Sequence, residues 1–163
     1  MSSCNRRKFL GLAAVATLSA CGFAPVYGPQ GGGIKLLGAV RVDDPKTRDD
    51  FLFVRTMEDR LGRPSNERYG LSYAIKLSAE AVAISSNNVT TRYNLLGEVT
   101  FSLRDLETDR VVSSGKAQNF TGYSASGTTI SAQAAEEDAR RRLMTILADD
   151  VTTRLAAAAT NLS

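Results

Sequence analysis

The 163-residue sequence contains no histidine and no tryptophan, and it has only two cysteines. Without histidine the chain cannot form a Ser-His-Asp triad, a Cys-His dyad or a His-ligated zinc site. These absences exclude most hydrolytic mechanisms, so we predict no catalytic residue, no metal site and no bound cofactor. The length suits one compact domain.

A basic stretch from Arg6 to Lys8 precedes an apolar run of twelve residues from Phe9 to Ala20. This order is typical of a secretory signal peptide, and we assign residues 1–20 to it. The run is shorter than the about 20 residues that a membrane-spanning helix needs, which makes a retained span the weaker alternative. The same stretch resembles a twin-arginine export motif, so the export route is left open.

Small residues stand directly before Cys21 in Leu-Ser-Ala-Cys, which resembles the lipobox of bacterial lipoproteins. In that class the thiol carries diacylglycerol and the amine freed by cleavage carries a further acyl chain. We predict that Cys21 becomes the acylated first residue, and the alternative is an ordinary cleavage that leaves a free thiol. Residues 21–33 hold two prolines and five glycines, which predicts a flexible tether.

Removal of residues 1–20 takes away three basic residues and no acidic one, which leaves 17 charges of each sign. A neutral chain lacks the basic field of nucleic-acid-binding proteins, so we predict no nucleic-acid partner. Cys4 leaves with the signal, and the single remaining thiol cannot form an intramolecular disulfide. The domain that we expect over residues 34–163 must therefore be held together by its hydrophobic core.

Hydrophobic periodicity predicts two helices and four strands in this domain. A capping box followed by apolar residues at helical spacing predicts a helix over residues 47–61, and a longer apolar stripe predicts a second over residues 130–158. A run rich in leucine and valine predicts a strand over residues 34–42. Alternating runs bounded by turn residues predict three long strands in a meander, over residues 71–84, 90–104 and 110–124.

The order β-α-β-β-β-α predicts an α+β fold. A sheet with one apolar face can bury the apolar stripes of both helices, so we expect a two-layer sandwich with a mostly antiparallel four-stranded sheet and both helices on one face. In the second helix, acids precede bases by four residues between Glu136 and Arg142. This pattern predicts a self-neutralised helix surface rather than a binding patch.

The turns predict how the long strands pair. A turn at residues 85–89 brings Lys76 opposite Glu98, and a turn at residues 105–109 brings Lys116 opposite the same carboxylate. Odd-numbered residues must pair with one another, because a one-residue slip would place polar side chains in the core. A shift by an even number of residues is the alternative. The expected pairs on the core face are Tyr73 with Phe101, Ile75 with Val99, Leu77 with Gly97 and Ala81 with Tyr93.

The segment Cys21-Gly22-Phe23-Ala24-Pro25-Val26-Tyr27-Gly28 resembles the acylated N-terminus of the outer-membrane lipopolysaccharide (LPS) assembly lipoprotein family, LptE, in its alphaproteobacterial form. The expected order of strands and helices is similar to that family over the rest of the chain. The resemblance implies a non-enzymatic lipoprotein that binds and plugs the β-barrel LptD and assists LPS transport to the cell surface. It implies the periplasmic side of the outer membrane as the location. An aspartate directly after the acylated cysteine favours inner-membrane retention, and this chain has Gly22 at that position.

The candidates for binding LPS phosphates are cationic side chains on the sheet face that points away from the helices. Arg92 and Lys116 both lie on this even-numbered face, although Arg92 is alternatively a rim residue and Lys116 a partner of Glu98. The face is otherwise rich in hydroxyl and amide side chains, which can meet a polar barrel lumen without burying unpaired charge. A solvated sheet face without a partner is the alternative interpretation.

Two other functions are alternatives. An auxiliary lipoprotein of a periplasmic phospholipid-transport ABC system would also join a lipid anchor to an α+β domain. An enzyme would need acid and base carboxylates, for which the pairs Asp43/Asp44 and Asp149/Asp150 are the candidates. No nucleophile or metal-ligand cluster accompanies these pairs in the sequence.

Overall fold

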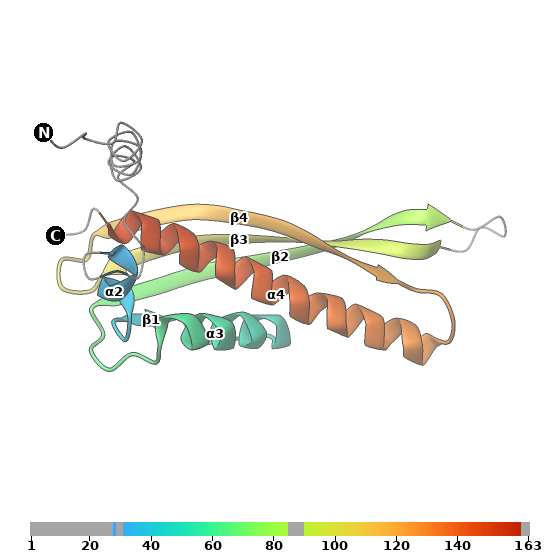
Figure 1. The fold of residues 1–163 in the computed structure, drawn as a ribbon, viewed down its shortest axis with the longest axis horizontal. Helices are drawn as coiled ribbons and strands as arrows, with labels where there is room; N and C mark the ends of the chain where they lie inside the picture. Colours follow the sequence, from blue (N-terminus) through green and yellow to red (C-terminus); the bar gives the residue numbers. More distant parts are fainter. Residues whose placement is uncertain (1–27, 29–30, 85–89, 161–163) are drawn as a thin grey trace, which may run out of the picture.

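The structure is a computed structural model that describes Gly28 and residues 31–84 and 90–160 (Figure 1). The predicted signal peptide, Cys21 and most of the predicted tether lie outside the described residues, so those assignments stay predictions. The elements in chain order are α2 (Gly32–Leu36), β1 (Val40–Val42), α3 (Arg48–Leu61), β2 (Tyr69–Ile84), β3 (Thr90–Asp105), β4 (Val111–Ser124) and α4 (Thr129–Ala159).

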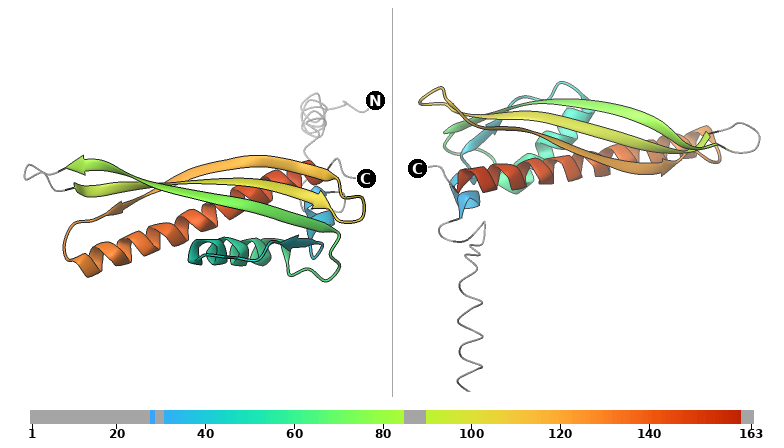
Figure 2. Two further views of the ribbon diagram at one scale, coloured as in Figure 1. Left: turned by 180° about the vertical axis from the view of Figure 1, so that it is seen from behind. Right: turned by 90° about the horizontal axis from the view of Figure 1, so that it is seen from above.

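The four strands form one sheet in the order β1-β2-β3-β4, and the two long helices lie on one face of it (Figure 2). β1 pairs with β2 in parallel, whereas β2, β3 and β4 form an antiparallel meander. The predicted α+β two-layer sandwich is therefore confirmed, with the short helix α2 as an addition. In Figure 1, α2 lies beside the C-terminal end of α4, at the opposite end of the molecule from the β2–β3 hairpin.

Helix α3 begins with the predicted capping box. The Thr47 hydroxyl accepts a hydrogen bond from the Asp50 backbone N–H, and the Asp50 carboxylate accepts one from the Thr47 N–H. The helix ends at Gly62, whose φ of 75° is a backbone conformation that glycine adopts without strain. One face of α3 is buried through Phe53, Val54, Met57 and Leu61.

Helix α4 buries a wider stripe than its sequence periodicity predicts. It packs against β4 and β3 on one side and against α3 on another, so two adjacent rows of side chains are removed from solvent. The apolar spacing that predicts the helix over residues 130–158 includes Ile146, which is instead 37% exposed. The buried residues are Ala139, Leu143, Met144, Leu147, Ala148, Val151, Thr152, Leu155, Ala156 and Ala159.

The predicted strand over residues 34–42 is wrong for its first part. Gly32–Leu36 forms a helix, and only Val40–Val42 pairs with β2. The glycines at 31–33, assigned to the tether from the sequence, are buried because α2 packs against the end of α4, with Leu36 in the core. A short apolar run does not distinguish a helix from a strand by period alone, so the sequence could not settle this segment.

The pairing of β2 with β3 is as predicted, with Lys76 opposite Glu98. The pairing of β3 with β4 is shifted by two residues, so that Glu98 lies opposite Gln118 and not opposite Lys116. The predicted turn is too short, because Arg104 pairs with Val111 and a register shift follows between Leu103 and Arg104. Within the turn, the Asp105 carboxylate accepts two backbone hydrogen bonds. Since the shift is even, the side chains of β4 from Ser113 onward stay on the predicted face, whereas Val112, beside the register shift, packs against the core.

Odd-numbered side chains of the meander face the helices and supply the sheet side of the core: Leu71, Leu95, Val99, Phe101, Leu103 and Ala117. Gly97 allows α4 to approach the sheet closely, since a Cβ atom there would lie 2.7 Å from Leu147 Cδ1. The even-numbered side chains of β2, β3 and β4 form the outer face, which no described helix covers (Figure 2).

Candidate functional site

The outer face carries a shallow hollow of about 590 Å³ across β2, β3 and β4. Ser78, Leu96 and Phe120 lie side by side in it as one row of the sheet. The Phe120 side chain is 61% exposed, which is unusual for a phenylalanine. A row of charged and amide groups borders the apolar row, so the outer face combines a polar surface with one exposed aromatic ring.

Glu98 is the centre of the charged row. Lys116 Nζ lies 2.9 Å from Glu98 Oε1, and the Gln118 side-chain amide donates a second hydrogen bond to the same carboxylate. Lys116 makes this contact diagonally, because it lies opposite Thr100 in the sheet. The hydrogen bonds from Lys116 and Gln118 hold the pKa of Glu98 below its usual value. This geometry favours the structural role of Lys116 over a role as an open phosphate-binding cation.

Arg92 is exposed and lies near the β2–β3 hairpin, opposite Ser124. In the part of the chain that the structure describes, no carboxylate forms an ion pair with it. Lys116 lies opposite Thr100, eight residues further along β3, which corresponds to about 26 Å at about 3.3 Å per residue. The structure therefore does not bring Arg92 and Lys116 together into one site.

Some of the predicted site lies outside the described residues. This holds for Cys21 and for the turn at residues 85–89. The side chains of Ile84 and Thr90, which the sequence assigns to the outer face, are not described either, although both residues belong to strands.

The opposite face of the sheet carries a second feature, which we call the β2-edge groove. It has a volume of about 810 Å³ and lies between β2, the segment that precedes α3, and α4. The Tyr73 side chain is half-buried in it, with its ring 5.0 Å from the ring of Phe53. Burial, and then the negative charges of Asp50, Asp43 and Asp44, raise the pKa of Tyr73 to about 12.

The raised pKa of Tyr73 predicts a pH-dependent contribution to stability. The folded state holds the phenol proton more tightly than the unfolded chain, whose tyrosine pKa is about 10. The contribution is therefore complete below pH 10 and is lost as the pH rises towards 12. Because the side chain is partly exposed, we expect on the order of 1 kcal/mol. Urea unfolding at pH 9 and pH 11.5 should show a larger loss for the native chain than for Tyr73→Phe, and equal losses would contradict this assignment.

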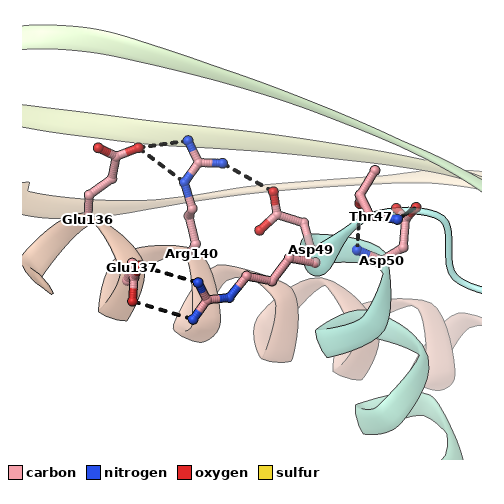
Figure 3. A network of polar contacts seen from close by, with 7 residues as sticks. Thr47, Asp49, Asp50, Glu136, Glu137 and Arg140 are labelled. Carbon is pink, nitrogen blue, oxygen red and sulfur yellow. Dashed lines mark hydrogen bonds and ion pairs between the residues drawn. The ribbon is translucent and has the colours of Figure 1, made fainter. Parts of the chain in front are cut away.

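An ion-pair network joins the N-terminal ends of α3 and α4 (Figure 3). Arg140 lies between Asp49, at 3.1 Å, and Glu136, at 2.7 Å. Glu137 pairs with Arg48 of α3 at 3.3 Å. The hydrogen bond to Glu136 is the largest cause of a raised pKa for Arg140. The network joins the two helices, and two of its members, Asp49 and Arg140, also line the β2-edge groove.

The basic run of α4 is neutralised, as the sequence predicts, but partly by other partners. Asp138 pairs with both Arg141 and Arg142, at 3.0 and 2.9 Å. The helical spacing assigns Glu137 to Arg141, but Glu137 forms its ion pair with Arg48 of α3 instead. Sequence spacing detects pairs within one helix, and it cannot detect a partner 89 residues away.

Of the two carboxylate pairs considered as catalytic candidates, one forms ion pairs with arginine side chains. Asp149 binds Arg60 at 2.7 Å, and Asp150 binds Arg154 at 2.9 Å. Asp43 and Asp44 are exposed at the end of β1 and belong to the β2-edge groove, which the sequence did not reveal as a site. Among the described residues, no group of three His, Cys, Asp or Glu side chains could hold a metal ion. No described helix is both long and apolar enough to cross a membrane.

Comparison with known structures finds the same fold in bacterial lipoproteins. A candidate lipoprotein from Caulobacter crescentus CB15 is 20% identical, with a TM-score of 0.65 over 81% of this chain and 98% of that chain. Rare lipoprotein B from Shewanella oneidensis is 14% identical, with a TM-score of 0.60 over 76% and 96%. A minor lipoprotein from Acinetobacter baumannii is 17% identical, with a TM-score of 0.54 over 73% and 89%. At these identities the similarity shows the shared fold.

Comparison by sequence gives the family. No curated protein sequence matches the chain significantly. The family model for LptE, described as lipopolysaccharide-assembly, matches residues 37–155, which is well over half of the chain and runs from the end of α2 almost to the end of α4. The chain therefore belongs to the LptE family of lipopolysaccharide-assembly proteins.

Proposed function

We propose that this chain is a non-enzymatic lipoprotein that binds and plugs the LptD β-barrel and assists LPS transport to the cell surface. The family match over residues 37–155 is the observation that carries the proposal, because it gives a role in LPS assembly. The auxiliary phospholipid-transport function, considered from the sequence, has no comparable support. The fold adds a physical reason, since it leaves one whole sheet face for a partner.

The outer face suits the wall of a barrel lumen. Its side chains are mainly small and polar, so contact with a polar lumen would leave little unpaired charge in the interface. Two of the charges in its centre are already paired, because Glu98 binds Lys116, while Lys76 lies opposite Glu98 and helps to lower its pKa. Phe120 adds an exposed aromatic ring, the kind of residue that supplies much of the binding energy in protein interfaces. The uncharged polar members of this face with described side chains are Ser72, Ser78, Asn94, Thr100, Ser102, Ser114, Gln118 and Ser124.

Arg92 is the better candidate for a contact with LPS phosphate. Its guanidinium can bind a phosphate through two parallel hydrogen bonds, and it has no ion-pair partner in the described part of the chain. Lys116 would first have to leave Glu98. We therefore expect Arg92→Ala to lower the amount of LPS retained by the purified protein more than Lys116→Ala does.

Co-purification with LptD from detergent extracts tests the proposal directly. The native chain should recover the barrel, and Phe120→Glu should recover at least tenfold less, because it places a charge in the interface. Ile130→Glu is the matched control, since Ile130 is 79% exposed but lies on α4 and not on the outer face. Failure of the native chain to recover LptD would overturn the proposal. Depletion that alters phospholipid asymmetry while surface LPS stays normal would point to the phospholipid-transport alternative.

The proposed anchor is an acylated Cys21, which would hold the protein on the periplasmic side of the outer membrane. Two or more acyl chains are needed for stable membrane binding, because a single myristoyl chain gives an association constant of only about 10⁴ M⁻¹. Helix α2 is the first described element, so the tether predicted before it would join the fold at the end where α2 packs against α4. We therefore expect the β2–β3 hairpin to point away from the anchor.

Cys21→Ser should release the protein from membranes into the soluble fraction. Cys4→Ser is the matched control, because Cys4 belongs to the predicted signal and its loss should leave anchoring unchanged. Fractionation should be combined with mass spectrometry of the mature N-terminus, since binding to a membrane partner could retain an unacylated chain. A mature N-terminus with a free thiol at Cys21 would overturn the anchor.

A further inference from the structure

Among the described residues, one edge of the sheet is unpaired over most of its length. β1 pairs with β2 only between Tyr69 and Leu71, whereas β2 continues to Ile84. In the described part of the chain, the last backbone contact on this edge is the Asp43 N–H, which donates to the Leu71 carbonyl oxygen. In Figure 1, α3 lies beside only the first part of β2, so the rest of the strand projects beyond it. Such an edge presents a row of N–H and C=O groups that another strand can bind.

The backbone groups that point to this open edge belong to odd-numbered residues. The Tyr69 N–H donates to Ala39 and the Leu71 carbonyl accepts from Asp43, so both face the β1 side. Because successive residues of a strand point their backbone groups to opposite sides, the next ones that face this edge are those of residues 73, 75, 77 and 79. These N–H and C=O groups have no strand partner among the described residues.

The open edge borders the β2-edge groove. Tyr73, Ile75 and Leu77 are half-buried on its β2 side, and they leave apolar surface that an added strand could cover. The volume of about 810 Å³ is within the range of about 300–1,000 Å³ that is typical of ligand-binding clefts. The groove therefore offers unpaired backbone groups and apolar side chains in the same place.

The charge of the groove indicates which chain would bind there. Four carboxylates and two cationic side chains line it, so its net charge is negative. Asp49 is bound to Arg140, and Asp50 belongs to the capping box. Asp43 and Asp44 are exposed, and neither forms an ion pair within the described residues. A basic occupant would complement these two charges.

We propose that the open edge of β2, from Tyr73 to Ala79, binds an extended basic segment of a partner protein as an added strand. Backbone hydrogen bonds to the odd-numbered residues provide the pairing, as in other cases of strand addition. Apolar side chains of the segment pack on Ile75 and Leu77, and its cations lie beside Asp43 and Asp44. The side chains that would bind the segment differ from those proposed to contact the barrel, such as Phe120, so different variants test the two proposals.

Hydrogen exchange with a defined peptide tests this inference. The probe is an eight-residue peptide of alternating lysine and valine, blocked at both ends, added to the full mature protein in detergent at low salt. The peptide should slow amide exchange at least tenfold at Tyr73, Ile75 and Leu77. The same peptide with every backbone nitrogen methylated should give no protection, because it keeps its charge and side chains but has no backbone donors.

Two double variants test the role of charge in peptide affinity, measured by fluorescence anisotropy. Asp43→Lys with Asp44→Lys should weaken binding of the lysine–valine peptide at least tenfold. Asp59→Lys with Glu107→Lys makes the same change in net charge at exposed positions outside the groove, and it should weaken binding less than twofold. This comparison separates a local contact from a general charge effect.

Several outcomes would overturn the proposal. These are equal binding of the methylated peptide, equal binding of a glutamate–valine peptide, or protection confined to β4. Protection of β2 that appears without peptide and rises with protein concentration would assign the edge to a second copy of this chain, and the proposal would again be wrong. Loss of LptD co-purification would not affect these results, so the two proposals fail separately.

Discussion

Replacement of Phe53 by alanine is expected to lower the free energy of unfolding by about 3–5 kcal/mol. The Phe53 side chain is 0% exposed on α3, and its ring packs against that of Tyr73 on β2. It therefore fills the junction between the helix layer and the sheet layer. Its truncation removes apolar burial and leaves a cavity that the surrounding backbone can close only in part. Because a domain typically has about 5–15 kcal/mol of stability, this is a large part of the total.

Phe51→Ala is the matched control for this prediction. Phe51 lies two residues earlier on the same helix, and its side chain is 55% exposed. Its removal should change the free energy of unfolding by no more than about 0.5 kcal/mol. Urea unfolding followed by circular dichroism gives both values. Similar losses for the two variants would show that α3 is not packed through the face that the structure assigns.

Most of the sheet could be predicted from the sequence because its periodicity is long and regular. In β2, apolar residues recur at every second position from Leu71 to Ala83. Such a pattern decides which face of the strand is buried, and every even shift of register keeps that face, so the faces can be predicted even where the length of the turn is predicted wrongly. The shift of β4 by two residues shows this, since Lys116 still reaches Glu98 from its new position.

Prediction failed where the deciding contact is remote in sequence. Residues 31–36 contain three glycines and a few apolar residues, which suit a tether or a strand when considered alone. They form a helix because they pack on the end of α4, more than 100 residues later. Arg48 and Asp49 are a similar case, since their partners Glu137 and Arg140 lie on the other long helix.

The two candidate sites also differ in how far the sequence could predict them. The chemistry of the outer face follows from strand parity, and the contact between Lys116 and Glu98 could be predicted from it. The β2-edge groove could not be predicted, because it depends on where α3 begins relative to β2 and on Arg140 of α4. The cluster of acids between Asp43 and Asp50 was its only sequence signal, and such clusters are common at the start of helices.

Gly32→Ala should release α2 from the end of α4. A Cβ atom at this position would lie 2.3–2.6 Å from backbone atoms of Thr160, Ala156 and Ala159. Backbone cannot rotate away as a side-chain terminus can, so α2 must move. We expect a loss of about 1–3 kcal/mol in the free energy of unfolding, together with faster amide exchange at Leu36. The direction of the change in the free energy of unfolding is informative, because replacing glycine by alanine in an open helix would stabilise the protein by about 0.5–1 kcal/mol.

Gly122→Ala is the control for this second variant. A Cβ atom at Gly122 would have its nearest neighbour at 3.5 Å, an ordinary contact, so the variant should keep its stability and its exchange pattern. If Gly32→Ala instead gained stability, the close approach of α2 to α4 would be wrong. If it lost stability as expected, the glycines at 31–33 would belong to the folded domain. The tether to the predicted anchor would then be confined to residues before 31, and the position of α2 would fix the end of the domain from which the tether leaves.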